Sequence, residues 1–209
     1  MSQDLAVALA VDLWDHECRD AAILVLLSHD CYLRAGEALR LKVGDYADGA
    51  QVNTGISGLS TARGLGGVSL RKTKTGPNQF VTIRDPLLIA LLNRHCATRV
   101  DGMPLFDINY TEYSRQFRAS LRRVDVHEFG FVLHSLRHGG ATHDFCNNVS
   151  HPSIQLRGRW QQLRSMVRYI NAGVALSMRL RYSEHTIRCI QAARTHTHAW
   201  FDFVQDPRQ

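Results

Sequence analysis

The stretch LHSLRHGGATHDF, residues 133–145, combines the spacing of a helix with an unusual density of cationic and titratable side chains. His134, Arg137 and His138 lie within five positions, and two consecutive glycines follow them. Residues three apart share one face of a helix, so an imidazole and a guanidinium are predicted to lie side by side. Each glycine costs about 1 kcal/mol relative to alanine inside a helix. We therefore expect the glycines to permit close approach of a neighbouring element.

An arginine and a histidine on one helix face are suited to binding a phosphate group. The guanidinium can donate to two phosphate oxygens at once, and the imidazole can donate one hydrogen bond or accept a proton. The spacing H-x-x-R is also common in helices that have only a structural role. The functional interpretation therefore depends on what else the chain carries.

Charge is distributed unevenly along the 209 residues, which have a formal net charge of +6. Before residue 31 the chain has six carboxylates and a single arginine, whereas residues 151–200 hold eight arginines and a single glutamate. This asymmetry predicts that a polyanion would meet the C-terminal half. The alternative is a basic face that only contacts solvent.

The cysteine content and hydropathy favour an intracellular protein. None of the five cysteines forms a C-x-x-C pair, so neither a disulfide framework nor a cysteine-rich zinc site is expected. No signal peptide is apparent, and the apolar run at residues 21–27 is too short to span a membrane. We expect no membrane association and a location in the cytoplasm or nucleoid of a prokaryote or the nucleus of a eukaryote.

The rest of the sequence predicts a mainly α protein with one small antiparallel sheet, an α+β fold. A Gly- and Ser-rich segment at residues 54–67 breaks any helix. Two strands, 68–74 and 79–83, are expected around a turn at 75–78. Helices are predicted at residues 17–28, 86–100 and 110–124, in the 133–145 stretch, and in two or three short segments beyond it.

Other segments give the H-x-x-R helix a context. YLRAGEAL, residues 32–39, contains Arg34 and Glu37, and Lys74 lies at the start of the predicted turn. RGRW, residues 157–160, follows the helix, and Tyr169 lies nine residues after Trp160. In this order and with these local spacings, the segments resemble the catalytic boxes of the tyrosine recombinase (phage integrase) family. HSLRH matches the second box, H-x-L-R-H, throughout.

The resemblance covers roughly residues 20–173 and has two departures from the family pattern. Tyr32 stands where the first box usually has glycine. Trp160 stands where the third box more often has histidine, a variant that Cre-like and other mobile-element recombinases also carry. We expect residues 1–173 to form the catalytic domain, without the family's N-terminal DNA-binding domain. Residues 174–209 are expected to form a helical tail that packs on a neighbouring protomer or folds back on its own domain.

The resemblance implies a set of catalytic residues: Arg34, Lys74, His134, Arg137, Trp160 and Tyr169. The Tyr169 phenol would attack a DNA phosphate and form a 3′-phosphotyrosyl link. The two arginines would clamp the non-bridging oxygens, and the lysine would be the general acid for the leaving 5′ oxygen. His134 would accept the tyrosine proton or bind a non-bridging oxygen. The Trp160 indole can only donate, so its role would be orientation and packing.

Further residues are expected to support this site or to contact DNA. Glu37 and His138 would buttress the catalytic side chains. The expected DNA contacts are Arg71, Lys72, Arg115, Arg118, Arg122 and Arg159. No metal and no other cofactor is expected, because the phosphotyrosyl bond conserves the energy of the broken bond.

The expected function is site-specific recombination or integration of double-stranded DNA by cleavage and rejoining, in a homotetramer. Two alternatives remain open. One is a DNA-relaxing enzyme similar to type IB topoisomerases, which needs no paired sites. The other is a catalytically silent DNA-binding remnant of a mobile element. The target sequence cannot be deduced from the predicted clamp, because phosphate contacts carry no base information.

Overall fold

The computed structural model describes residues 1–48, 66–73, 76–170 and 172–205, which are mostly helical with one small antiparallel sheet. This confirms the predicted fold class. The helices are α1 (Gln3–Asp15), α2 (Arg19–Asp30), α3 (Ala35–Ala38), α4 (Pro86–Cys96), α5 (Tyr110–Arg123), α6 (His134–Cys146), α7 (His151–Gly158), α8 (Leu163–Val167), α9 (Ala172–Arg179) and α10 (Glu184–Gln205). Short 3₁₀ turns occupy Val43–Asp45 and His127–Phe129.

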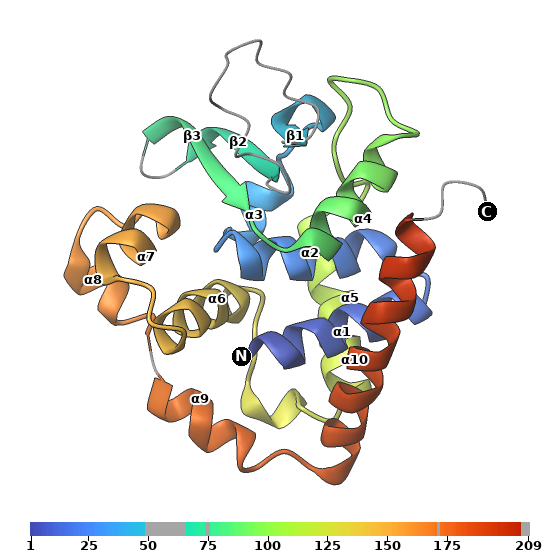
Figure 1. Cartoon of the computed structure of the whole chain (residues 1–209), viewed down its shortest axis with the longest axis vertical. Helices are drawn as coiled ribbons and strands as arrows, with labels where there is room; N and C mark the ends of the chain where they lie inside the picture. Colours follow the sequence, from blue (N-terminus) through green and yellow to red (C-terminus); the bar gives the residue numbers. More distant parts are fainter. Residues whose placement is uncertain (49–65, 74–75, 171, 206–209) are drawn as a thin grey trace.

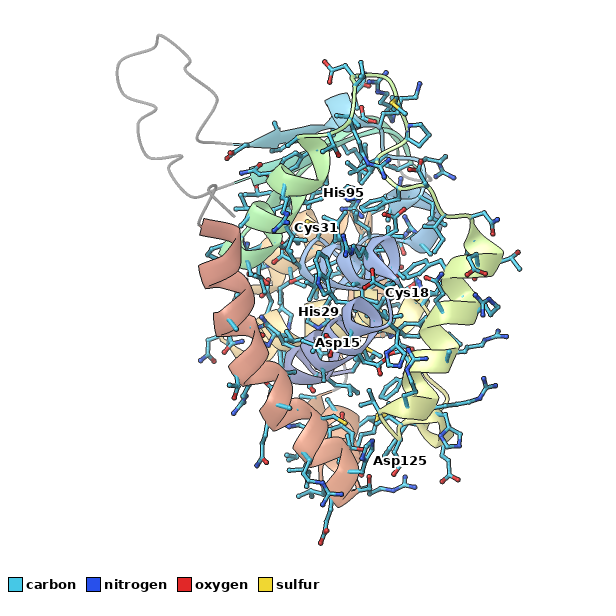
Figure 2. All side chains as sticks on the ribbon, turned by 90° about the vertical axis from the view of Figure 1, so that its right-hand side faces the viewer. Asp15, Cys18, His29, Cys31, His95 and Asp125 are labelled. Atoms are coloured by element: carbon cyan, nitrogen blue, oxygen red, sulfur yellow. The ribbon has the colours of Figure 1, made fainter. Side chains whose placement is uncertain are left out.

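The core is built around α2, in which every residue from Ala21 to His29 is buried. Such burial on all sides explains why the apolar run of this helix lacks a polar stripe. Helix α1 packs against α2, with α5 on one side of the pair and α10 on the other (Figure 2). The sheet lies at the top of the molecule in Figure 1, and α6, α7 and α8 lie together on the left of that view, below the sheet.

The sheet has the strand order β1 (Tyr46–Asp48), β2 (Gly66–Thr73) and β3 (Gly76–Ile83), all antiparallel. The β2–β3 hairpin corresponds to the two predicted strands, although β3 begins three residues earlier than 79. Strand β1 was not predicted, because three residues are too few to show an alternating pattern. Residues 54–65 of the Gly- and Ser-rich segment lie outside the described residues, and Gly66 and Gly67 begin β2.

The predicted helices at 17–28 and 110–124 are confirmed as α2 and α5 with small shifts at their ends. Helix α1 was not predicted. The tail at 174–209 contains two helices rather than one, because α9 ends at Arg179 and α10 begins at Glu184. The break coincides with Ser183, whose hydroxyl accepts a hydrogen bond from the Thr186 N–H at 3.2 Å. A serine in this relation caps the start of a helix.

The C-terminal tail packs on its own chain. Ala193 of α10 is buried against Ala8 and Val11 of α1. The Thr186 hydroxyl donates to the carbonyl of Val124 at 2.9 Å. Within this single chain, α10 therefore lies along α1 and the end of α5. Within the part of the chain that is described, no helix has both the length and the apolar character to cross a membrane.

Candidate active site

Helix α6 begins at His134 and lies directly against α2 because its two glycines have no side chains. A Cβ at Gly140 would lie 2.0 Å from the His29 carbonyl oxygen and 2.6 Å from the Tyr32 ring. A Cβ at Gly139 would lie 3.1 Å from the His29 ring. The glycines therefore permit the close approach expected from the sequence, and they bring α6 under the α2–α3 turn.

The variant Gly140→Ala is expected to lower the free energy of unfolding by about 3 kcal/mol, because the added methyl group meets backbone rather than a movable side chain. Chemical denaturation measures the difference. Gly173→Ala in α9 is the matched control, since a Cβ there has no described atom within 4 Å. It is expected to be neutral or slightly stabilising. Equal stability of Gly140→Ala and the native chain would show that α6 does not approach α2 this closely.

Arg137, on the buried face of α6, has no exposed surface. Its guanidinium donates to the carbonyl of Tyr32 through Nη1 and to the carbonyl of Gly158 through Nη2, the latter at 2.5 Å. Its Cζ lies 4.5 Å from the centre of the Trp160 ring and 5.9 Å from that of Tyr169. Two backbone carbonyls and two aromatic rings therefore fix this cation in one orientation.

Three guanidinium groups gather around one buried carboxylate, Glu37. Arg34 donates to it through Nη1 at 2.5 Å, and Arg159 donates to it through Nη2 at 3.0 Å. Burial raises the pKa of Glu37, but the Arg34 N–H and both guanidiniums outweigh it and hold the pKa below its ordinary value. Burial first, then Arg34 and Arg159, lower the pKa of Arg137 to about 9, so it stays charged at neutral pH. The cluster has excess positive charge, which suits an anionic ligand.

Tyr169 lies in the turn between α8 and α9. The Thr142 hydroxyl donates to its backbone carbonyl at 3.2 Å, which ties the turn to α6. Its phenol oxygen is 3.3 Å from Nε2 of His134, slightly longer than a strong hydrogen bond. The His138 ring lies 4.2 Å from the Tyr169 ring between centroids, and the Trp160 ring lies 5.1 Å away. The structure thus brings the predicted tyrosine to the predicted histidine.

The surroundings of the two histidines beside Tyr169 favour their neutral forms. Burial, followed by the charges of Arg137 and Arg34, lowers the pKa of His134. Burial, followed by His134, lowers the pKa of His138 to about 4. A neutral imidazole can accept a proton from a phenol, whereas an imidazolium cannot.

Three of the other tyrosines have their phenols engaged or enclosed. Tyr32 donates to Asp144, and Tyr46 donates to Asn93 at 2.7 Å. Tyr113 is fully buried. Burial is the main cause that raises the pKa of each of these phenols. They are poorly suited to act as nucleophiles.

The two arginines of the RGRW segment, Arg157 and Arg159, both bind groups inside the protein. Arg159 is almost fully buried, with a left-handed backbone (φ +58°) at the end of α7 that turns it toward the carbonyl of Tyr32 and toward Glu37. Its guanidinium therefore faces the Glu37 cluster, and its predicted contact with DNA stays a prediction. Arg157 was not singled out, yet it donates to the carbonyls of Asp30 and Thr82 at 2.7 and 2.9 Å. It fastens α7 to α2 and β3.

The remaining predicted residues lie farther out. Arg71 on β2 is exposed and pairs with Asp45 at 2.5 Å. Lys72 belongs to β2, and Lys74 lies outside the described residues. On α5, Arg115 pairs with Glu112, whereas Arg118 and Arg122 are exposed and have no carboxylate partner among the described residues. The part of the chain that is described contains no group of three or more side chains suited to a metal ion.

Tyr32 and Asp144 are the members of the site that the sequence missed. The Tyr32 carbonyl accepts from Arg137 and Arg159, and its phenol donates to Asp144. The sequence offered one indication for Tyr32, which is that the family that this chain resembles usually has glycine at that position. Asp144 gave no signal, because a carboxylate near the end of a helix is ordinary.

Comparisons with known proteins extend this description. No protein-family model matches the chain, and a search of curated proteins finds no match. Among solved structures, XerA recombinase matches with a TM-score of 0.61 and 17% identity over 87% of this chain and 64% of that protein. The XerH site-specific recombinase, bound to its difH substrate in a pre-cleavage complex, matches with a TM-score of 0.63 and 16% identity over 81% of this chain.

The chain thus spans 64% of the XerA chain and 49% of the XerH chain. At such low identities the likeness concerns the backbone arrangement. The described part of this chain has the catalytic-domain fold of the tyrosine recombinases.

Proposed function

We propose that this chain is a tyrosine-type DNA recombinase that cuts and rejoins double-stranded DNA through a covalent link to Tyr169. The observation that carries the proposal is the contact between Tyr169 and His134, directly beside the buried Arg137. A nucleophile, a neutral proton acceptor and a fixed cation are the groups that phosphoryl transfer without a metal requires. The fold shared with two recombinases supports the same conclusion.

In the proposed reaction the Tyr169 oxygen attacks the scissile phosphorus and passes its proton to His134. The bond from phosphorus to the 5′ oxygen breaks, and Lys74 protonates that oxygen. Arg34 and Arg137 stabilise the charge on the non-bridging oxygens. The product is a 3′-phosphotyrosyl link and a free 5′-hydroxyl, so a second 5′-hydroxyl can reverse the step with another strand.

A phosphate reaches Arg137 only after a movement of the site. The guanidinium has no exposed surface here, because Trp160 and Tyr169 cover it. Tyr169 lies between two short helices, after α8 ends at Val167 and before α9 begins at Ala172, and a shift of this segment would leave the core undisturbed. DNA binding is therefore proposed to displace the tyrosine ring from Arg137 and to place it in line with the phosphorus.

The proposal is tested with a nicked duplex that loses its cut end, so that a cleaved intermediate cannot be rejoined. The chain, incubated with this DNA in the presence of a metal chelator, should give a covalent adduct on a denaturing gel. Tyr169→Phe should give none while retaining DNA affinity. Since the target sequence is unknown, the DNA is drawn from the ends of the element that encodes the protein. An adduct that persists in Tyr169→Phe would refute the proposed nucleophile.

We also propose that the chain acts as a homotetramer on two paired DNA sites. It would do so in the cellular compartment that holds the DNA. Recombination of two sites in one plasmid is the expected product. Relaxation of a plasmid without such sites would instead indicate a topoisomerase-like enzyme.

The pH dependence of cleavage follows from His134. Since its pKa is lowered from 6.5, the rate of adduct formation should stay constant from pH 8 down to about 6.5 and fall only at lower pH. His134→Gln removes the titrating group and should show a low rate without that fall. Single-turnover rates measured across this range provide the test. A fall centred above pH 6.5 in the native chain would contradict the neutral imidazole.

DNA affinity should depend on α5. Arg118→Ala or Arg122→Ala should weaken binding and reduce the slope of log K against log salt by about 1, as expected for one lost phosphate contact. Arg188→Ala on α10 is the control, because α10 lies on the opposite side of the molecule (Figure 2). Fluorescence anisotropy over a salt series measures both quantities. Equal slopes for all of these variants would exclude α5 from the DNA interface.

A further inference from the structure

Tyr32 has an unfavourable backbone conformation that something in the structure must stabilise. It lies in the turn between α2 and α3, is almost fully buried, and has a φ of +49°. This left-handed region is easily reached by glycine but rarely by an aromatic residue. A residue held there indicates that its surroundings determine its conformation.

The carbonyl of Tyr32 is the point at which two buried cations meet. Arg137 donates to it through Nη1, and Arg159 donates to it through Nη2 at 3.1 Å. Each arginine has a second acceptor, the carbonyl of Gly158 for one and the carboxylate of Glu37 for the other. A change of Tyr32 to another φ region would turn this carbonyl away, and Arg137 would keep only the Gly158 carbonyl.

The side chain of Tyr32 fastens this turn to α6. The phenol donates to Asp144, which lies two turns after Arg137 on the same helix. Asp144 also accepts from Nη1 of Arg84 at 3.1 Å. The Arg157 guanidinium lies 5.4 Å above the Tyr32 ring. Helix α6 therefore holds Tyr32 through Asp144, and the carbonyl of Tyr32 in turn orients Arg137 of the same helix.

We propose that Tyr32 is a positioning residue for DNA cleavage, in which the bond between its phenol and Asp144 holds the backbone carbonyl that aims Arg137. The inference rests on the proposed function. Glycine at this position would reach the same φ without strain, but it would lack the tether. Tyrosine at this position is less favourable in the left-handed backbone conformation than glycine, but its tether fixes the carbonyl and therefore the Arg137 guanidinium.

The test compares Tyr32→Phe, Tyr32→Gly and the conservative variant Asp144→Asn. Tyr32→Phe loses the donor and should slow adduct formation at saturating DNA by between about tenfold and a hundredfold, since small errors of position cost this much. Its Kd for DNA should stay within about twofold. Tyr32→Gly should be at least as slow, although it relieves the strain. Asp144→Asn keeps an acceptor oxygen and should retain most of the rate.

Tyr46→Phe is the control, because the Tyr46 phenol likewise donates a hydrogen bond to a side chain, although Tyr46 is only half-buried and lies at the sheet, against Asn93 of α4. It should cleave at the native rate. All rates are measured well below the melting temperature of each variant. The inference would be overturned, with the proposed function intact, by cleavage at the native rate in Tyr32→Phe. An equal loss of cleavage rate in Tyr46→Phe, or a Tyr32→Phe variant that loses only DNA affinity, would have the same consequence. Absence of any adduct from the native chain would instead refute the proposed function and the inference with it.

Discussion

Arg137→Ala is expected to slow formation of the covalent DNA adduct by about three orders of magnitude, a loss typical of removing a fixed charge from a transition state. The substitution also leaves the carbonyls of Tyr32 and Gly158 without their donor in the interior. Each unsatisfied buried group costs about 1–3 kcal/mol. We therefore expect the free energy of unfolding to fall by about 3 kcal/mol.

Arg137→Lys separates the two effects. The ammonium keeps the charge, but a single nitrogen cannot reproduce the fork that spans both carbonyls. DNA affinity should therefore be retained, while cleavage remains at least about a hundredfold slower than in the native chain. Single-turnover cleavage, anisotropy and thermal melting measure the three quantities. Cleavage by Arg137→Lys at the native rate would show that Arg137 does not act through its orientation.

Glu37→Gln is expected to destabilise the protein by about 3 kcal/mol and to reduce cleavage strongly. Among the described residues, Glu37 is the carboxylate that pairs with both Arg34 and Arg159, and its side chain is only 3% exposed. Removing one partner of a buried ion pair leaves the other charges uncompensated. Arg34 and Arg159 would repel Arg137, so the orientation of the whole cluster would change.

The pH dependence of this effect has a definite sign. Because the folded protein holds the pKa of Glu37 below its ordinary value, its charge stabilises the fold fully above about pH 4.3. That contribution is lost as the pH falls through the folded pKa. The stability difference between the native chain and Glu37→Gln should therefore be constant near pH 7 and narrow in acid.

Denaturant titrations at several pH values check this prediction. Glu112→Gln is the control, because the carboxylate of Glu112 also binds an arginine but lies on the surface of α5. It should leave the free energy of unfolding unchanged. A Glu37→Gln variant as stable as the native chain would show that the arginine cluster needs no buried counter-charge.

Local spacing was enough to predict much of the fold and part of the site. The three-residue interval places His134 and Arg137 on one helical turn. The choice of Tyr169 among six tyrosines came from the resemblance, because the family has its tyrosine nine residues after the third box, which ends here at Trp160. The structure brings these four residues together. Helix α5 was predicted for the same reason, since its periodicity is a property of neighbouring residues.

Features that depend on distant contacts were not predictable. Whether Arg159 faces solvent or Glu37 depends on one left-handed residue at the end of α7, which no propensity indicates. In the sequence Tyr32 is a tyrosine where the first box usually has glycine. The sequence does not show that its carbonyl accepts a hydrogen bond from Arg137. The packing of α10 depends on small residues of α1 that lie far away in the sequence.

The central claim, that Tyr169 is the nucleophile, is tested most directly by locating the DNA on the protein. The adduct from the nicked duplex is digested with nuclease and trypsin, and the peptide that carries the residual nucleotide is identified by tandem mass spectrometry. The account predicts a phosphotyrosyl nucleotide on the peptide that begins at Tyr169, directly after Arg168. A nucleotide on any other residue would contradict the account.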